Sequence, residues 1–334
     1  MKIKTLFYNA HEQRTRFLWR VIVQIVLMLL LSIIPVLILQ LLLILGLIGS
    51  IRTDTAGGML VFSLIMLFSI MASIWLAGRW MDRRRMSGFG LHINSAWWQD
   101  FAFGLGLGVG LISLVFLVEW VFGFITIDHF FQQAPGMSFS MGMVTWAGVY
   151  FCVGIYEEML FRGYYLTNLA EWLGRFRIIK PRMAVILALV FTSLAFGVAH
   201  ANNPNASLLS SLNITLVGIF LLGLGYVLTG EMGISIGLHM TWNFFQGNVF
   251  GFPVSGLQGG QSSIIAITQN GPEWLTGGSF GPEAGLLGLL ATLLGAVIII
   301  LWVKQREGQT QIDVKIAEAP QDFIKVKSQP DLEA

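Results

Sequence analysis

The run WRVIVQIVLMLLLSIIPVLILQLLLILGLI, residues 19–48, decides the fold class, because it is apolar almost throughout and its only charge is Arg20 at the start. A membrane-spanning helix needs about 20 mainly apolar residues, so this run predicts one. The polar lead before it and its length argue against a cleaved signal peptide. The whole chain agrees: its 334 residues are 55% hydrophobic and 11% charged, with a mean hydropathy of +0.73. Soluble domains carry about 25% charged residues, which excludes that class.

Seven further apolar runs follow along the chain, so we expect an all-α polytopic membrane protein with about eight transmembrane helices. The eight expected spans are 19–48, 58–80, 100–125, 141–166, 183–201, 207–229, 232–250 and 283–303. Within the third span, GLGLGVG at 104–110 is typical of close packing between membrane helices.

The basic residues are concentrated in alternate loops, which predicts the topology. The segments on the basic side contain Lys2, Lys4, Arg14, Arg16 and Arg20, then Arg79, Arg83, Arg84 and Arg85, then Arg175, Arg177, Lys180 and Arg182, then Lys304, Arg306, Lys315, Lys325 and Lys327. The opposite loops hold only Arg52. We therefore expect both termini in the cytoplasm and a multi-pass protein of the plasma (inner) membrane, in contact with membrane lipid. These residues form no recognition stripe, so no nucleic-acid partner is expected.

Five regions are expected. Residues 1–140 hold transmembrane helices 1–3 and a basic cytoplasmic loop, and 141–250 form the core with helices 4–7. Residues 251–282 form an external Gly- and Ser-rich loop that looks weakly structured. Residues 283–304 are helix 8, and 305–334 form a flexible cytoplasmic tail. The lone cysteine, Cys152, excludes an intramolecular disulfide and a cysteine-cluster metal site.

The stretch GIYEEMLFRG, residues 154–163, places two carboxylates and an arginine inside the fourth span. A charge at the bilayer centre costs on the order of 3 kcal/mol, so these residues are functional candidates. Glu158 and Arg162 are four residues apart and share a helix face, so we expect them to pair. Glu157 lies about 100° around the helix and is expected to be the carboxylate left to act.

Two further clusters lie in later spans: FGVAH, from Phe196 to His200, and HMTWN, from His239 to Asn243. A glutamate with histidine partners can deprotonate a water, and histidines can also hold a metal. An amide or a histidine can donate a hydrogen bond to a developing oxyanion. The set supplies what peptide-bond hydrolysis needs, although the chain lacks an H-E-x-x-H metalloprotease motif.

Taken in order, E-E-x-x-x-R at 157–162, F-x-x-x-H at 196–200 and H-x-x-x-N at 239–243 resemble the three motifs of the CPBP family. This family joins CAAX prenyl proteases and bacteriocin-processing enzymes, and its domain is also called Abi. The resemblance covers about residues 141–250 and implies an intramembrane endopeptidase acting on a peptide or a membrane-anchored, for example lipidated, protein. It implies these catalytic residues: Glu157, Glu158, Arg162, His200, His239 and Asn243.

By this resemblance Glu157 activates the water, assisted by His200, while His239 and Asn243 stabilise the oxyanion or contribute to a metal site. Phe196 is expected in a substrate-binding or structural role. Whether a metal is bound stays open; a divalent ion such as zinc is a candidate cofactor, with Glu157, His200 and His239 as candidate ligands.

Other interpretations remain open on the sequence alone. The acid pair and Arg162 can be a buried structural ion network, and His239 and Asn243 can bond between helices. The lone acid Glu119 is read as structural or as lining a cavity. A proton- or ion-coupled transporter is one rival function, and a non-catalytic immunity or scaffold factor of the same fold is another. Counting residues puts His200 nearer the outer face than Glu157, so the side on which the site opens stays undecided.

Overall fold

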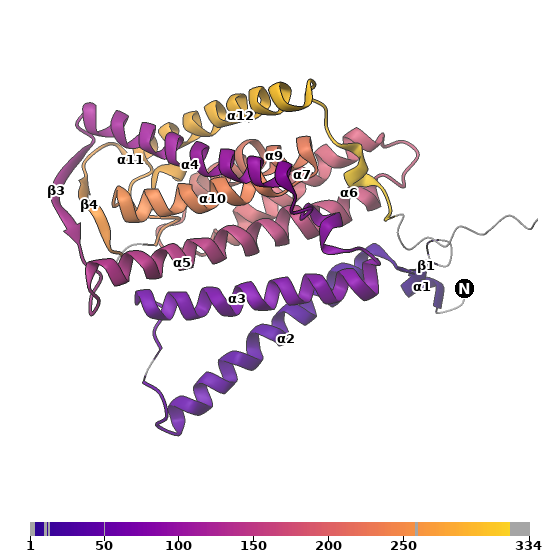
Figure 1. Cartoon of the computed structure of the whole chain (residues 1–334), viewed down its shortest axis with the longest axis horizontal. Helices are drawn as coiled ribbons and strands as arrows, with labels where there is room; N and C mark the ends of the chain where they lie inside the picture. The colour runs from indigo at the N-terminus through magenta and orange to yellow at the C-terminus, as the bar shows by residue number, and fades with distance from the viewer. Residues whose placement is uncertain (1–3, 10–11, 13, 50, 258–259, 321–334) are drawn as a thin grey trace, which may run out of the picture.

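The computed structural model describes residues 4–9, 12, 14–49, 51–257 and 260–320 as a bundle of long helices with two small strand pairs (Figure 1). Seven helical segments in this described part are long and apolar enough to cross a membrane. They are α2 (Phe17–Ile44), α3 (Ala56–Ala77) with η1 (Gly78–Asp82), α4 (Ser95–Val121), α5 (Phe139–Glu158) with η3 (Met159–Leu166) and α6 (Thr167–Leu173), α7 (Pro181–Ala199), α8 (Leu208–Val217) with η4 (Gly218–Leu222) and α9 (Gly223–Thr229), and α12 (Leu286–Glu307). The predicted all-α polytopic membrane fold is confirmed.

The span expected at 232–250 is a shorter helix that lies within the bundle. It consists of α10 (Gly233–Phe244) and its π-helical continuation η5 (Phe245–Val249). Nearly every side chain of α10 is buried, because α4 and α5 pack on it. A helix surrounded by protein in this way meets little lipid, so its length need not match the bilayer.

Glycines bring α10 and α4 into close contact. A Cβ atom on Gly104 or Gly108 of α4 would collide with backbone atoms of α10. In return, a Cβ atom on Gly233 or Gly237 of α10 would collide with backbone atoms of α4. Small residues allow membrane helices to approach until their backbones touch, and the expectation from the GLGLGVG run is confirmed.

One end of the bundle carries a two-stranded antiparallel sheet, and we call it the sheet end (Figure 1). Strand β3 (Ile125–Gln132) pairs with β4 (Ser263–Gln269), from Ile125 opposite Gln269 to Gln132 opposite Ser263. The expectation that residues 251–282 are weakly structured is therefore wrong for this strand. The β-branched run SIIAITQ finds a partner that lies before the fifth helix in sequence, so nothing local signals the pairing.

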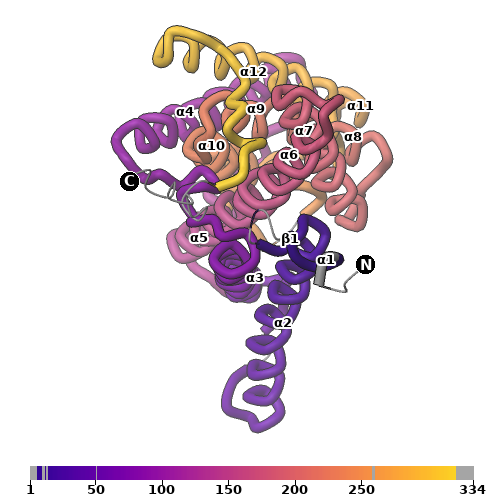
Figure 2. Tube along the Cα trace, turned by 90° about the vertical axis from the view of Figure 1, so that its right-hand side faces the viewer, coloured from indigo at the N-terminus to yellow at the C-terminus, as the bar shows by residue number. Residues whose placement is uncertain are grey.

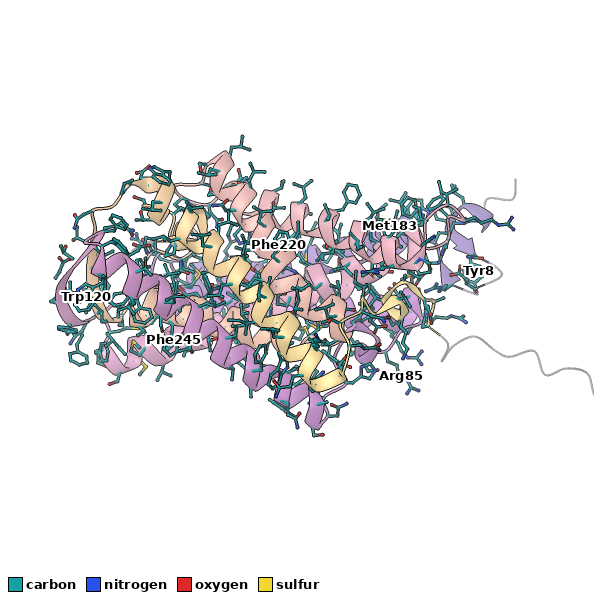
Figure 3. All side chains as sticks on the ribbon, turned by 90° about the horizontal axis from the view of Figure 1, so that it is seen from above. Tyr8, Arg85, Trp120, Met183, Phe220 and Phe245 are labelled. Carbon is teal, nitrogen blue, oxygen red and sulfur yellow. The ribbon has the colours of Figure 1, made fainter. Side chains whose placement is uncertain are left out.

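The opposite end, which we call the basic end, holds Tyr8 and Arg85, whereas Trp120 lies at the sheet end (Figure 3). Short elements complete it and the loops: α1 (Lys4–Phe7), β1 (Tyr8–Asn9), β2 (Arg14–Thr15), η2 (Met86–Phe89), α11 (Glu273–Thr276), η6 (Pro282–Ala284) and η7 (Val314–Ala317). Part of the segment expected as a flexible tail packs here, because the Asp313 N–H donates to Val227 O at 2.8 Å and Ile316 is buried. Residues 321–334 of that expected tail lie outside the described residues.

A buried ion network, which we call the arginine cluster, ties the basic end together. Its members are Arg14, Arg20, Asp82, Arg84, Glu171 and Arg175. The Glu171 carboxylate accepts from all four arginines, and the Arg84 guanidinium also donates to Glu318 O at 2.9 Å. This network fixes the N-terminal strands, the end of α3, α6 and the segment after α12 to one another. Helix α2 leaves the body from this end and stands apart at its far end (Figure 2).

Candidate active site

The two glutamates lie at the last turn of α5, where the helix changes its winding. Glu158 is fully buried, while the side chain of Glu157 is 19% exposed. The π-helix η3 starts at the next residue, Met159, and runs to Leu166. π-helical segments cost hydrogen-bond quality and are frequent at functional sites. Two more of them, η4 and η5, lie in the helices that face this point.

The predicted ion pair between Glu158 and Arg162 is present, at 3.2 Å between Oε1 and Nη1. The same Oε1 lies 2.8 Å from His239 Nδ1, which brings α10 to α5. Because an ionised carboxylate only accepts hydrogen bonds, His239 donates from Nδ1. Its other ring nitrogen, Nε2, then faces Glu157 Oε2 at 3.8 Å. Glu158 therefore sets the ring so that Nε2 points at the freer carboxylate.

Arg162 is held on three sides. Besides Glu158, its guanidinium donates to Gly218 O at 3.3 Å and lies over the Phe196 ring, 4.3 Å from the ring centroid. A Cβ atom at Gly218 would come within 2.9 Å of Arg162 Nη2, so glycine leaves the room that the guanidinium needs. The cation–π contact and the carbonyl fix Arg162, and through it Glu158.

Phe196 and His200 come from the end of α7, where His200 is the residue that caps the helix. His200 Nδ1 lies 2.8 Å from Phe196 O and donates to that carbonyl, leaving Nε2 as an acceptor. The Phe196 ring contacts the His200 ring, at 4.6 Å between centroids, and the His239 ring, at 6.4 Å. Phe196 thus contacts both histidines and Arg162.

A cavity of about 30 Å³, which we call the inner cavity, is lined by four of the predicted site residues. It is lined by Phe196, His200, Ile214, Val217, Leu221, Leu222, Leu238, His239, Trp242, Asn243, Ser255 and Glu283. Its size is that of one or two water molecules. Glu157 is not in the lining, but it lies next to His239, which is. No hydrogen bond or ion pair joins Glu157 to His200 in the described part of the chain.

Sequence reasoning missed three residues that close this cavity toward the sheet end, and we call them the clasp: Gln246, Ser255 and Glu283. Glu283 Oε1 accepts from Ser255 N at 2.5 Å and from Ser255 Oγ at 3.0 Å, and Oε2 accepts from Gln246 Nε2 at 2.5 Å. Burial raises the pKa of the Glu283 carboxyl, and the hydrogen bonds from Ser255 and Gln246 oppose that rise. The signal available in the sequence was an acid placed at the edge of the eighth span.

The clasp connects the loop after His200 to the helix that carries Asn243. Asn203 Nδ2 donates to Ser255 O at 2.9 Å, and Asn203 lies in the turn closed by its own N–H on His200 O. Gln246 follows Asn243 on the same helix and also donates to Pro253 O at 2.5 Å. Ser255 and Glu283, at the two ends of segment 251–284, are therefore held in place at the site.

The candidate metal ligands do not fit a three-ligand site. Nowhere in the described ranges do three or more His, Cys, Asp or Glu side chains come together in a group suited to a metal ion. Protein zinc sites use three or four such ligands. Of the candidates, Glu157 and His239 lie 3.8 Å apart and His200 and His239 both line the inner cavity, while the Nδ1 atoms of both histidines are bonded elsewhere. No chemical step is therefore assigned to a metal.

One protein-family model matches the part of the chain that contains the candidate site. Residues 139–245, about a third of the chain, match the model for the family described as type II CAAX prenyl endopeptidase Rce1-like. The match begins at the start of α5 and ends just past Asn243, so it contains all the predicted site residues. The chain matches no curated protein and no solved structure.

Proposed function

We propose that the chain is an intramembrane endopeptidase in which Glu157 activates a water molecule, because residues 139–245 match the model of the Rce1-like CAAX endopeptidase family. The observation that supports this most is the series of contacts Arg162–Glu158–His239–Glu157. It fixes the position of each buried charge, and its last contact, at 3.8 Å, leaves room for a water at Glu157. A general base needs a fixed position and a free lone pair within hydrogen-bond reach of the proton that it takes.

The 3.8 Å between Glu157 Oε2 and His239 Nε2 is too long for a direct hydrogen bond. Both atoms are acceptors in this arrangement, so a water that donates one proton to each fits between them. Glu157 takes a proton as the water oxygen bonds to the carbonyl carbon. Both protons of that water are then used, so His200, whose Nε2 also accepts, has no bond to the water in this scheme.

The carbonyl oxygen gains negative charge in this step, and the Asn243 amide at the inner cavity is the donor we assign to it. The expectation that His239 also donates is not kept, because its one N–H is directed to Glu158. Glu157 then returns its proton to the amide nitrogen as the carbon–nitrogen bond breaks. Glu158 and Arg162 act as positioning residues, since they hold His239 and touch no reacting atom in this scheme.

We further propose that the basic end faces the cytoplasm of a plasma (inner) membrane, because cytoplasmic loops carry the excess of Lys and Arg. The inner cavity then lies toward the outer side, next to segment 251–284. The substrate in this proposal is a membrane-anchored peptide or protein, lipidated or not, that enters from the bilayer.

The test compares cells with the wild type and with Glu157→Ala at equal membrane levels, and maps new peptide N-termini in membrane and secreted fractions. Termini that vanish in the variant support proteolysis and identify a substrate. Identical profiles under several growth conditions would contradict it and favour a scaffold or immunity role. A transporter would instead show loss of flux with unchanged termini.

A further inference from the structure

A second, larger cavity of about 390 Å³ lies at the sheet end, and the proposed chemistry does not use it. We call it the sheet-end pocket. Its polar side chains come from both strands and from the segments beside them: Gln132, Gln261, Ser263, Gln269, Asn270, Glu273 and Ser279. Carboxamides can both donate and accept, so they suit the alternating N–H and C=O groups of a peptide backbone.

The sheet-end pocket and the inner cavity are lined by neighbouring residues of one segment. Phe252 and Pro253 line the pocket, and two positions later Ser255 lines the inner cavity. The clasp bonds to this segment, since Gln246 Nε2 bonds both Pro253 O and Glu283 Oε2. A chain that passes from the pocket into the inner cavity would therefore meet the clasp.

The charge of the sheet-end pocket favours one kind of ligand. Glu273 is its only charged lining residue, and it is exposed. Around it, in the described sheet-end loops, Asp54 is bonded to Arg52 at 2.5 Å, and Asp128 on β3 is exposed with a neutral partner, Thr268, at 2.8 Å. The pocket thus carries negative charge without a basic side chain in its lining, which attracts cations and repels acids.

We propose that the sheet-end pocket binds the polar segment of the substrate that leaves the membrane beside the cleaved bond, and that it selects neutral or basic segments over acidic ones. This proposal rests on the proposed protease function, because the ligand of the pocket is the substrate of that protease. An intramembrane protease has to house a polar segment next to the scissile bond, and this pocket is polar, adjacent and of sufficient size. Glu273 sets the charge preference, and the clasp is the partition that the bound chain displaces.

The test measures binding without cleavage, so that it is independent of the catalytic proposal. Full-length protein carrying Glu157→Gln is placed in phosphatidylcholine nanodiscs, which removes anionic lipid. The probes are short Gly/Ser peptides with a neutral dye, carrying several Lys, no charge, or several Glu. Fluorescence anisotropy at low salt should show the order Lys, neutral, Glu in decreasing affinity, because screening is then weakest.

Variants locate the binding. Glu273→Gln should weaken the Lys peptide about three- to tenfold and leave the neutral peptide unchanged. Asp128→Asn removes the same charge from β3 outside the pocket lining and should change either affinity less than about twofold. Ser279→Trp, at an exposed position of the lining, fills the pocket and should abolish binding of the Lys and neutral peptides alike.

Equal affinity for the Lys and Glu peptides, or full binding to Ser279→Trp, would overturn the proposal. Binding that follows the predicted order while no N-termini depend on Glu157 would support the pocket and refute the protease. Glu157-dependent termini without peptide binding would refute the pocket and leave the protease standing.

Discussion

Two buried ion networks lie in this bundle, the arginine cluster at the basic end and the pair Glu158–Arg162 with His239 at the candidate site. In the arginine cluster, every carboxylate oxygen of Glu171 accepts from at least two guanidinium groups. At the site, Glu158 Oε2 has no hydrogen-bond partner in the described part of the chain, and Glu157 has only the 3.8 Å approach of His239.

The difference separates a structural network from a chemical one. A saturated carboxylate has no lone pair left for a substrate or a water, so Glu171 can only hold segments together. A carboxylate that is fixed on one side and open on the other can exchange a proton, and this describes Glu157. The number of charges does not make the distinction; their unused hydrogen-bonding capacity does.

The first prediction concerns Glu157, the carboxylate with free hydrogen-bonding capacity. Glu157→Gln keeps the size of the side chain and removes its basicity, so cleavage should fall by about 100-fold or more, the contribution typical of a general base. The midpoint of thermal unfolding should stay within a few degrees of wild type, because among the described residues Glu157 would lose only the 3.8 Å approach of His239. The control is Glu231→Gln, a loop residue paired with His92 outside the site, which should keep wild-type cleavage.

The second prediction concerns the buried pair Glu158–Arg162. Arg162→Leu leaves Glu158 buried without its cation, which should cost about 3–5 kcal/mol of stability. Adding Glu158→Leu removes the orphaned charge and should restore most of that stability. Cleavage should not return in the double variant, because His239 has lost the acceptor that orients it. Recovery of cleavage together with stability would show that the pair has no positioning role.

The third prediction uses the arginine cluster as the structural counterpart. Glu171→Gln deprives four arginines of their shared carboxylate and should destabilise the protein by about 3 kcal/mol, measured by thermal unfolding in detergent. Cleavage per folded molecule should equal that of wild type. A specific loss of cleavage at unchanged stability would mean that the two networks were assigned the wrong way round.

The smallest effect concerns the clasp and pH. Burial raises the pKa of Glu283 above that of the unfolded chain, so the folded state binds the proton more tightly. Its contribution to stability is complete below the ordinary glutamate pKa of about 4.3 and is lost as pH rises through the raised value. Glu283→Gln should therefore flatten the decline of the melting midpoint above about pH 4. A decline as steep as in wild type would contradict this assignment.

Much of the fold could be predicted from composition, because the bilayer requires long apolar helices and places Lys and Arg at one end. The Glu158–Arg162 pair could be predicted too, since it depends only on helical spacing. The strand pair β3–β4 and the clasp could not, because their partners are far apart in sequence and carry no local period. The arginine cluster was visible only as topology signals, since its carboxylates Asp82 and Glu171 stand in separate helices.

The sequence also did not predict the shortness of helix α10 or the π-helical segments η3, η4 and η5 at the site. Whether a run crosses the bilayer alone or is enclosed by neighbours is a tertiary property, and Gly233–Val249 is enclosed. A π-helical turn costs hydrogen-bond quality that only the surrounding packing can offset. The contacts that hold Arg162 against Gly218 and Phe196 are of this kind.

Chemical rescue of Glu157→Ala tests whether Glu157 is the general base. The measurement is the cleavage rate of a substrate found by N-terminus mapping, with purified protein in nanodiscs and increasing formate. If Glu157 is the base, the alanine variant should be inactive alone and regain part of its rate as formate enters the space left by the side chain. Glu157→Gln, which fills that space, should not respond. Cleavage by Glu157→Ala near the wild-type rate without formate would contradict the assignment.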